Sequence, residues 1–420
     1  MKISLIQHQI RIYKMSDVNP FLSEDIWFEI FKKLPVKTLG KCRCVCKSWH
    51  SLVVSPSFMA AHHKHYTQNN ANSLILCKEV VKRSETEELE QCIFFRNLDQ
   101  LKQGNRLHTS VWPFVVCQPF QSSFHFVGCV NGLLCLSDTD HLGHRDRILI
   151  WNPLIQKSIK LRNSSCKGSH SLVGFGYDYQ RNDHRVVKIS YSAAKTPFVE
   201  VYSVQKRKWR TICADYLVDN LITEISASPC FCNGLIYWPI RSRRMEISNN
   251  PIVECLLLYN VAEERFSKME LPEEIVKCSR YGDFGIFEYS GMLSVSHCQY
   301  MFLEMSTTTH CQIWVKQDCN VESSWCKIVN DCVSYGYHHE GSLHYLGANK
   351  ELVGFNKENT GQLVSYNPKT GHITELGFNV SQSPKFCAYS ESLALLDQKT
   401  DNRTAAELKR SVNRRPRGNF

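Results

Sequence analysis

The stretch ILIWNPLIQKSIKL at residues 148–161 contains a short apolar run that includes a tryptophan, then a polar turn and a second run with basic residues. The same kind of unit recurs at residues 199–212, 256–271, 312–328 and 363–376. The aromatic markers of the five copies are Trp151, Tyr202, Tyr259, Trp314 and Tyr366, which are 51, 57, 55 and 52 residues apart. A unit of fifty-odd residues is therefore repeated along most of the chain.

A second series of short motifs alternates with the first, and each motif is interpreted as a turn followed by an inward-packing strand. These motifs are VNGLLCLS from Val130, CNGLIYW from Cys232, SGMLSVS from Ser290, GSLHYLG from Gly341 and ESLALLD from Glu391. The period and the short strands predict a large all-β kelch-like propeller of about six blades over residues 73–397. The charged segment from Lys78 to Asn105 is expected to be a long loop or a ragged first blade. The alternative is a pair of irregular β-sandwiches, which do not require equal spacing.

The N-terminal part of the chain has a helical period instead. Apolar residues at spacings of three and four predict a helix from Leu22 to Leu34, which Pro35 ends. A short helix from Val36 and a third from about Cys46 to Val54 complete a three-helix module. The fold class is thus α+β and multidomain, with a small helical module before the β region.

So few helices supply a small core, and the module is expected to need a partner. Trp27, Phe31, Val36 and Trp49 cannot all face inward, so surplus apolar surface ringed by lysines predicts a protein-docking face. The alternative is a helical cap that packs on the rest of the chain.

Composition places the chain among folded, reduced proteins. Of 420 residues, 43% are hydrophobic, and no apolar run is long enough for a transmembrane helix, so we expect no membrane partner. The first fifteen residues lack the apolar centre of a signal peptide. The twenty cysteines are therefore expected to be mostly buried thiols in the cytoplasm or the nucleus. Met15 is an alternative start.

The expected domains are an N-terminal extension (1–17), the helical module (18–63), a linker (64–72), the β domain (73–397) and a basic disordered tail (398–420). Residues 401–420 contain six basic residues and two acidic ones, so this segment carries +4 of the chain's formal net charge of +10. The tail is a nuclear-import or nucleic-acid patch, or a solubilising terminus. We expect the second, and no nucleic-acid partner, because no aromatic residue is interleaved for base stacking.

Motifs for chemistry are absent. The sequence has no GxSxG elbow, phosphate-binding loop or HExxH motif, and Gly174-Phe175-Gly176 lies on an expected strand rather than at the start of a helix. Cys42, Cys46 and His50 would share a face of a continuous helix, but their spacing does not match structural zinc sites. We expect no metal, no cofactor and no catalytic site. His62, His63 and His65 are interpreted as a solvated helix end.

The run FLSEDIWFEIFKKLPVKTLGKCRCVCKSWHSLVVSPSF at residues 21–58 resembles a plant F-box. The resemblance lies in Leu-Pro-Val-Lys at residues 34–37, Arg-Cys-Val-Cys-Lys at 43–47, Trp49, Pro56 and Phe58. Ser23 departs from the pattern, which usually has proline there. The resemblance implies binding to the Skp-type adaptor of an SCF ubiquitin ligase and, through it, to cullin and RING subunits. The implied adaptor interface, with the small core behind it, is Leu22, Ile26, Ile30, Leu34, Pro35, Val36, Leu39, Val45, Cys46 and Trp49.

The β region resembles the F-box-associated domain of plant F-box proteins. VGCVNGLLCLSD, ILIWNPLIQKSIKL, VGFGYDYQRNDHRVVKIS and LVSYNPKTGHITELGF carry this resemblance. The chain is most similar to S-locus F-box and S-locus F-box-like proteins of pollen, which implies an S-locus ribonuclease target and a role in self-incompatibility. F-box/kelch proteins that act in receptor turnover are close competitors.

Together these resemblances imply a non-catalytic receptor that brings a protein target to the ligase. Loops at one rim are expected to hold the target, and the candidates are Ser137–Arg147, Ser192–Phe198, Ile240–Pro251 and Ser296–His310. The third is the most charged, so Arg241, Arg243, Arg244 and Glu246 are the candidate target-binding residues. The rival interpretation is a ligand-binding or enzymatic propeller with an unrelated helical appendage, and convergent acidic residues at one propeller mouth would favour it.

Overall fold

The computed structural model of the chain describes residues 22–68, 74–82, 89–97, 114–115, 125–139, 146–161, 170–192, 195–213, 217, 229–242, 252–278, 282–303, 306–318, 324–335, 344–345, 351–356, 362–379 and 385–396.

The helical module has the three expected helices and one more. The helices are α2 (Glu24–Lys32), α3 (Val36–Cys42), α4 (Lys47–Val54) and α5 (Pro56–Gln68). Pro35 separates α2 from α3, and α4 ends at Val54, as the prolines predict. Pro56 then starts α5, because proline fits the first turn of a helix, where its missing N–H costs nothing. The helix continues past residue 63, where the linker was expected to begin.

Six four-stranded antiparallel sheets make up the β strands that the structure describes. Five of them are formed by consecutive strands. They are β4 (His125–Val130), β5 (Leu133–Thr139), β6 (Asp146–Asn152) and β7 (Lys157–Lys160); β8 (His170–Asp178), β9 (Asp183–Ser192), β10 (Lys195–Ser203) and β11 (Lys208–Ile212); β12 (Cys230–Cys232), β13 (Leu235–Ser242), β14 (Ile252–Asn260) and β15 (Arg265–Glu270); β16 (Gly282–Tyr289), β17 (Met292–Leu303), β18 (Ser306–Lys316) and β19 (Trp325–Tyr335); and β20 (His344–Tyr345), β21 (Leu352–Asn356), β22 (Gln362–Tyr366) and β23 (Ile373–Asn379).

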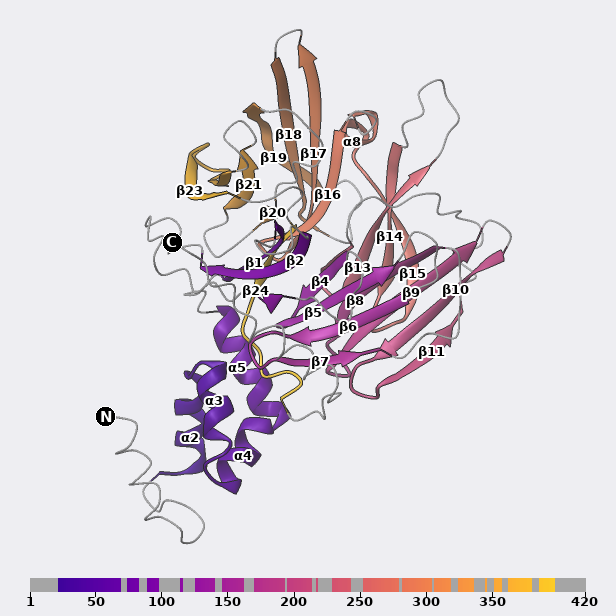
Figure 1. Cartoon of the computed structure of the whole chain (residues 1–420). Coiled ribbons are helices and arrows are strands. Elements are labelled where there is room, and N and C mark those ends of the chain that lie inside the picture. Colours follow the sequence, from indigo (N-terminus) through magenta and orange to yellow (C-terminus); the bar gives the residue numbers. More distant parts are fainter. Residues whose placement is uncertain are drawn as a thin grey trace.

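The remaining sheet joins the two ends of the β region. Its order is β24 (Lys385–Tyr389), β1 (Leu74–Lys82), β2 (Leu89–Asn97) and β3 (Phe114–Val115). The first strands of neighbouring sheets, β4, β8, β12, β16, β20 and β24, contact one another in a closed ring (Figure 1). The fold is therefore a propeller closed by its C-terminal strand, and the prediction of about six blades is confirmed.

The repeat occupies the same place in each blade. Trp151, Tyr202, Tyr259, Trp314 and Tyr366 all lie on the third strand of their sheets, namely β6, β10, β14, β18 and β22. The turn between the first and second strands also recurs, with positive φ at both Asn131 and Gly132 (47° and 72°), at Asn233 and Gly234, and at Ser290 and Gly291. Two successive positive φ values define the hairpin turn whose twist matches the strands it joins.

Some expectations about the β region were wrong. ESLALLD, expected to be a turn and a strand, has no strand in its described residues, 391–396. The candidate loop Ser296–His310 lies mostly in β17 and β18, which pair from Ser294↔Val315 to Leu303↔Ser306. Ser296 and His297 at its start are polar but buried, so polar residues here do not mark a loop. The segment Lys78–Asn105, in contrast, agrees with the expectation of a ragged first blade, because its described residues form the end of β1 and all of β2.

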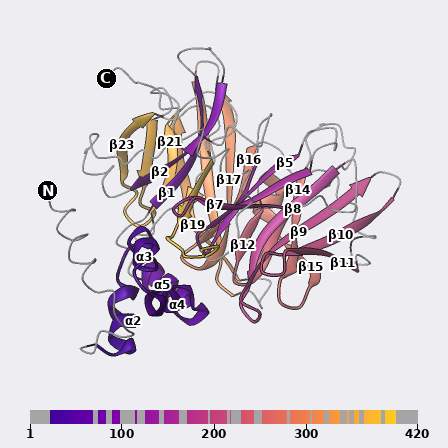
Figure 2. The ribbon, with the colours of Figure 1, turned by 60° about the horizontal axis from the view of Figure 1, so that its bottom comes forward.

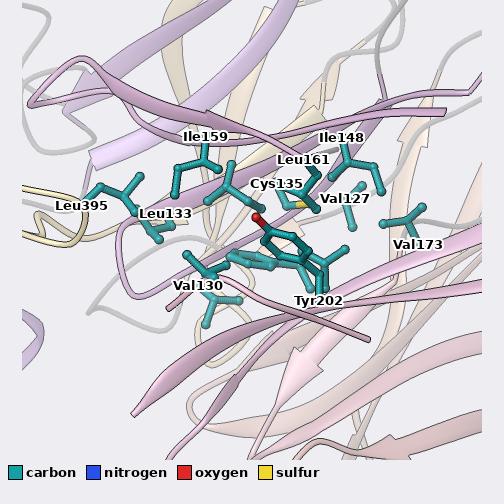
Figure 3. Packing of buried hydrophobic residues seen from close by; sticks show 14 residues of the cluster. Val127, Val130, Leu133, Cys135, Ile148, Ile159, Leu161, Val173, Tyr202 and Leu395 are labelled. Atoms are coloured by element: carbon teal, nitrogen blue, oxygen red, sulfur yellow. The ribbon is translucent and has the colours of Figure 1, made fainter. Parts of the chain in front are cut away.

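Neighbouring sheets pack face to face through buried aliphatic and aromatic residues. The cluster between the sheets of β4–β7 and β8–β11 includes Val130, Leu133, Ile148 and Tyr202 (Figure 3). Leu395, from the C-terminal end of the described chain, completes this cluster. The C-terminal segment therefore belongs to the core.

Gly174 and Gly176 on β8 make room for the neighbouring sheet. A Cβ at Gly174 would lie 2.3 Å from Cζ2 of Trp238, and a Cβ at Gly176 would lie 2.8 Å from the ring of Phe231. Two aromatic side chains thus occupy the space left by the glycines. This packing accounts for Gly174-Phe175-Gly176 without a phosphate site.

The turn at Gly132 allows a direct test of how the C-terminal segment packs. A Cβ at Gly132 would lie 2.3 Å from Cβ of Ser392 and 2.6 Å from the carbonyl oxygen of Ser390. Gly234 has the same turn conformation with nothing within 4 Å. Gly234→Ala is expected to lower the free energy of unfolding by about 1 kcal/mol, the cost of positive φ. Gly132→Ala is expected to lower it by about 2 to 4 kcal/mol, because overpacking is added. Urea unfolding measures both, and equal losses would contradict the packing.

The buried side chain of His184 is expected to make the fold less stable in mild acid. His184 stacks on Phe175, and its Nε2 lies 3.2 Å from the carbonyl oxygen of Val130, which accepts its hydrogen bond. Burial lowers its pKa from 6.5 to about 4. Between pH 6.5 and pH 4 this histidine is protonated in the unfolded chain but stays neutral in the folded chain. The free energy of unfolding therefore falls as the pH drops from 6.5 toward 4. By pH 5 the loss should be about 2 kcal/mol.

The measurement is urea unfolding at pH 7 and pH 5. His184→Gln, although less stable at pH 7, should lose about 2 kcal/mol of the stability difference between pH 7 and pH 5. His62 and His63, whose pKa values burial also lowers, keep their share of that difference. His50→Gln, at an exposed position on α4, should keep the wild-type dependence. An unchanged pH dependence in His184→Gln would contradict the assignment.

Candidate functional site

Exposed apolar side chains gather on the helical module. Within the described residues five large hydrophobic side chains are exposed, and three of them are Ile26 (44%), Ile30 (40%) and Val45 (50%). Ile26 and Ile30 are one turn apart on α2, and Val45 lies between α3 and α4. Nothing in the described part of the chain covers these three side chains, as expected for a docking face.

The predicted adaptor-binding residues divide into a surface set and a core set. Pro35 and Cys46 are exposed together with Ile26, Ile30 and Val45, whereas Leu22, Leu34 and Trp49 are half-buried. Val36 and Leu39 are fully buried. The sequence pattern thus combined residues that can contact a partner with residues that support them.

The aromatic residues expected to compete for the interior pack together. The ring of Trp49 lies 4.8 Å from that of Trp27 and 4.9 Å from that of Phe31, measured between centroids. Phe31 and Val36 are buried in the same cluster. Trp27 and Trp49 pack against this cluster but are only half-buried, so the expectation that the four side chains cannot all face inward is correct in part. The cluster itself is completed by residues from elsewhere in the chain.

That additional core comes from the C-terminal strap, which we define as residues 390–396. Leu393 and Leu396 of the strap are buried among Phe31, Val36 and Leu39. Leu154 and Ile155, from the turn between β6 and β7, pack against the same cluster. Figure 1 shows the strap as a gold trace between α5 and β7, and Figure 2 shows the helices beside the same end of the propeller. The helical module therefore packs on the rest of the chain, as the alternative interpretation expected.

The strap caps a helix of the module. Pro35 precedes α3 and provides no side-chain cap, so the first N–H groups of α3 need another acceptor. The carboxylate of Glu391 accepts a hydrogen bond of 3.0 Å from the N–H of Val36. Burial raises the pKa of Glu391, while this hydrogen bond and Lys37 oppose the shift. The negative end of the strap thus stabilises the positive end of α3.

The strap is held to the propeller by buried hydrogen bonds. The Asn152 side-chain amide donates to the carbonyl oxygens of Ser392 (2.8 Å) and Ala394 (2.9 Å). The carbonyl oxygen of Leu396 accepts from Arg43 of the module at 2.9 Å and also from Lys157 of β7. Each bond satisfies a strap carbonyl that has no strand partner.

Two histidines of α5 belong to this junction, and their interpretation as a solvated helix end was wrong. His62 is fully buried, with Nε2 2.9 Å from the carbonyl oxygen of Leu34. His63 lies between the strap and the propeller, with Nδ1 3.3 Å from the carbonyl oxygen of Glu391 and Nε2 3.1 Å from Oδ1 of Asn131. Burial lowers the pKa of both histidines, so they remain neutral at pH 7.

The described residues show neither a cluster of metal ligands nor a membrane-spanning helix. Across the described residues no group of three His, Cys, Asp or Glu side chains could hold a metal ion. Cys42 ends α3 and Cys46 precedes α4, so Cys42, Cys46 and His50 do not lie on one helix. No helix in the described ranges is long and apolar enough to cross a membrane.

Of the four candidate target-binding residues, the structure describes one, Arg241. Arg241 is placed on β13, where it pairs with Val253. Arg243, Arg244 and Glu246 lie outside the described residues. The prediction for this loop therefore stays a prediction.

Sequence reasoning missed the residues that attach the module to the propeller. Asn152 lies in the motif ILIWNPLIQKSIKL and Glu391 in the motif ESLALLD. Nothing in a single sequence indicates that residues 355 positions apart, such as Val36 and Glu391, form a hydrogen bond. The available signal was the incomplete core of the helical module, which predicts that it packs on something.

The comparison with known families agrees with this architecture. The F-box domain family matches residues 21–60, and the F-box associated beta propeller domain family matches residues 80–399. Among relatives, an F-box/kelch-repeat protein of Arabidopsis thaliana is 23% identical over 310 residues, which cover 72% of this chain and 77% of that protein. F-box protein CPR1 of Arabidopsis thaliana is 23% identical over 333 residues, covering 72% and 71%.

Among solved structures, TolB from Acinetobacter baumannii aligns with a TM-score of 0.42 and 10% identity, covering 79% of this chain and 73% of TolB. That similarity is too low to support an argument. The propeller family alone spans most of the chain, and the F-box precedes it. The chain belongs to the family of F-box proteins that carry an F-box-associated β-propeller domain.

Proposed function

We propose that this protein is the substrate-recognition subunit of an SCF ubiquitin ligase. The F-box binds a Skp-type adaptor, and through it cullin and RING subunits, while the propeller captures a protein target. The observation that carries the proposal is the exposure of Ile26, Ile30 and Val45 on the F-box, where they leave apolar side chains open to solvent. Exposed aliphatic anchors surrounded by charge are suited to a protein interface.

Lysines around these anchors support the same proposal. Lys33, Lys37, Lys41 and Lys47 are exposed. Because Skp-type adaptors are acidic as a family, such a cluster would steer the two proteins together and raise the association rate. The receptor itself needs no catalytic group, since holding a target beside the ligase makes the transfer effectively intramolecular.

The junction also supports this role. The strap contacts α3, α5 and the propeller at the same time, so the F-box and the propeller are joined by a buried core as well as by the chain. A target on the propeller is then held in a defined orientation relative to the adaptor-binding face.

We expect surface substitutions on α2 to weaken adaptor binding without unfolding the protein. Trp49 is unsuitable for this test because it packs on Trp27 and Phe31. Ile26→Ala with Ile30→Ala removes two exposed side chains, which should weaken binding about 10- to 100-fold. Co-expression with a Skp-type adaptor followed by titration measures the affinity.

Ile373→Ala is the matched control, because Ile373 is an equally exposed isoleucine on the propeller (50%). It should bind the adaptor like the wild type. If the folded double variant binds the adaptor as tightly as the control, the proposed interface is wrong.

For the target, we propose the charged loop at residues 240–251, with Arg241, Arg243, Arg244 and Glu246 as contacts. Resemblance to S-locus F-box proteins supports an S-locus ribonuclease as the target and a role in self-incompatibility, while receptor turnover is the competing pathway. Exchange of residues 240–251 between two related chains should transfer target choice, as measured by co-precipitation. Unchanged target choice would contradict this assignment.

The rival function, a ligand-binding or enzymatic propeller, is less well supported. It would be favoured by several unpaired acidic side chains at one propeller mouth. At the end that faces the F-box, Asp178 lies 2.9 Å from Arg181, and Asp183 lies 3.3 Å from Arg185. These carboxylates are paired within the chain. An F-box that binds the adaptor would exclude this rival.

A further inference from the structure

A chain of contacts leads from the F-box to the propeller axis. His63 contacts Asn131 on the turn after β4, and the carbonyl oxygen of Val130 on the same turn bonds to His184. The ring of His184 lies 4.8 Å from that of Tyr177, near the end of β8. The turns after β8, β12 and β16 therefore lie at the same end of the propeller as the F-box. They belong to the inner strands that form the ring around the axis.

Tyr179, on the turn after β8, is the most exposed large hydrophobic side chain in the described part of the chain, at 60%. Its ring is nevertheless held in place. It lies 5.1 Å from the ring of Tyr177, edge to face, and stacks over Phe231 at 6.4 Å. One side of Tyr179 is therefore supported by aromatic neighbours while the rest faces solvent.

Glu288 lies at the same end of the propeller, on the inner strand that follows β12 around the axis. It is on β16 and shares a side of the strand with Phe284 and Ile286, which pack toward Cys230 and Cys232 of β12. Its charge acts on Tyr179 and contributes to the raised pKa of that phenol. Tyr179 belongs to the blade of β8–β11 and Glu288 to the blade of β16–β19, and β12 lies between them. Phe231 on β12 stacks with Tyr179, and the side-chain amide of Asn233, just after β12, donates a hydrogen bond of 2.9 Å to the carbonyl oxygen of Gly291, just after β16.

The carboxylate of Glu288 has no cationic partner among the described residues, in contrast to Asp178 and Asp183. A backbone hydrogen bond from Gly291 is its one stabilising contact in the described chain, and Glu288 remains exposed to solvent. The surrounding protein raises the pKa of the carboxyl group. An unpaired carboxylate in partly desolvated surroundings is stabilised when a cation approaches.

An aromatic face beside a carboxylate is complementary to one kind of side chain. Lysine and arginine can place their charge against the carboxylate and lay their stem or guanidinium plane on the ring. We propose that Tyr179, Phe231 and Glu288 bind a lysine or arginine side chain of the target protein. The proposal rests on the proposed function, because it assumes a captured protein. It adds a target contact at the F-box end, separate from the loop at residues 240–251.

Location and charge both favour a target segment as the occupant. The site opens to solvent at the end of the propeller that faces the F-box, so a bound segment would lie on the ligase side. The competing occupant is the basic C-terminal tail, which follows the strap at this same end and contains Arg414, Arg415 and Arg417. The test therefore includes a variant that removes these tail charges.

The experiment measures retention of the labelled full-length chain on arrays of short peptides. The peptides have random flanking residues and a central Arg, Lys or Gln. The variants are Glu288→Gln, Tyr179→Ala and, as matched control, Glu263→Gln, which removes an exposed carboxylate from the turn between β14 and β15. Circular dichroism and thermal unfolding check that each variant is folded.

The wild type and Glu263→Gln should prefer the Arg and Lys arrays over the Gln array at low salt. The preference should fall about tenfold in Glu288→Gln and about threefold in Tyr179→Ala, in line with an ion pair and a cation–π contact. It should weaken as salt is raised. An equal preference in Glu288→Gln and Glu263→Gln would overturn the proposal.

The tail is tested with Arg414, Arg415 and Arg417 replaced by Gln in the full-length chain. If the preference appears only in this variant, the tail occupies the site and the target proposal is overturned. Adaptor binding is measured on the same samples. Glu288→Gln that binds adaptor but keeps the peptide preference contradicts this inference alone, whereas a folded wild type that fails to bind adaptor contradicts the proposed function.

Discussion

The hydrogen bond from the N–H of Val36 to the carboxylate of Glu391 joins the two functional parts of this protein. It represents a wider constraint, namely that the F-box cannot complete its own core. The strap supplies Leu393 and Leu396 to that core, and Glu391 supplies the acceptor that Pro35 cannot provide to α3. The strap in turn depends on Asn152, whose amide binds two of its carbonyl groups. Closure of the propeller by β24 brings all of these residues together.

This arrangement separates support from recognition. Val36 and Leu39 are buried against the strap, while Ile26, Ile30 and Val45 remain exposed. The exposed side chains of α2 are thus held by packing that continues into the propeller. His62, which is buried, and His63, which is half-buried, add uncharged polar contacts to the junction.

Local pattern was enough to predict much of the fold. The five aromatic markers occupy equivalent third strands, because each blade repeats the same four-stranded antiparallel unit. The helices of the F-box begin and end where prolines require it. Reasoning failed where a segment had no regular partner: ESLALLD has alternating apolar residues, yet its leucines face two different cores and it pairs with no strand. The hairpin of β17 and β18 was mistaken for a loop because its sequence is rich in polar residues, although Ser294, Ser296 and His297 on β17 are buried.

The sequence by itself determined the α+β architecture, the approximate number of blades and the family resemblance, since these follow from periodicity and from motifs of adjacent residues. Tertiary structure alone decided which members of the F-box motif are exposed, how the strap joins the F-box to the propeller, and that Tyr179 meets Phe231 and faces Glu288 from another blade. The physical reason is that such contacts depend on chain closure. Residues hundreds of positions apart become neighbours only after the ring of blades has formed, and no local spacing encodes their distance.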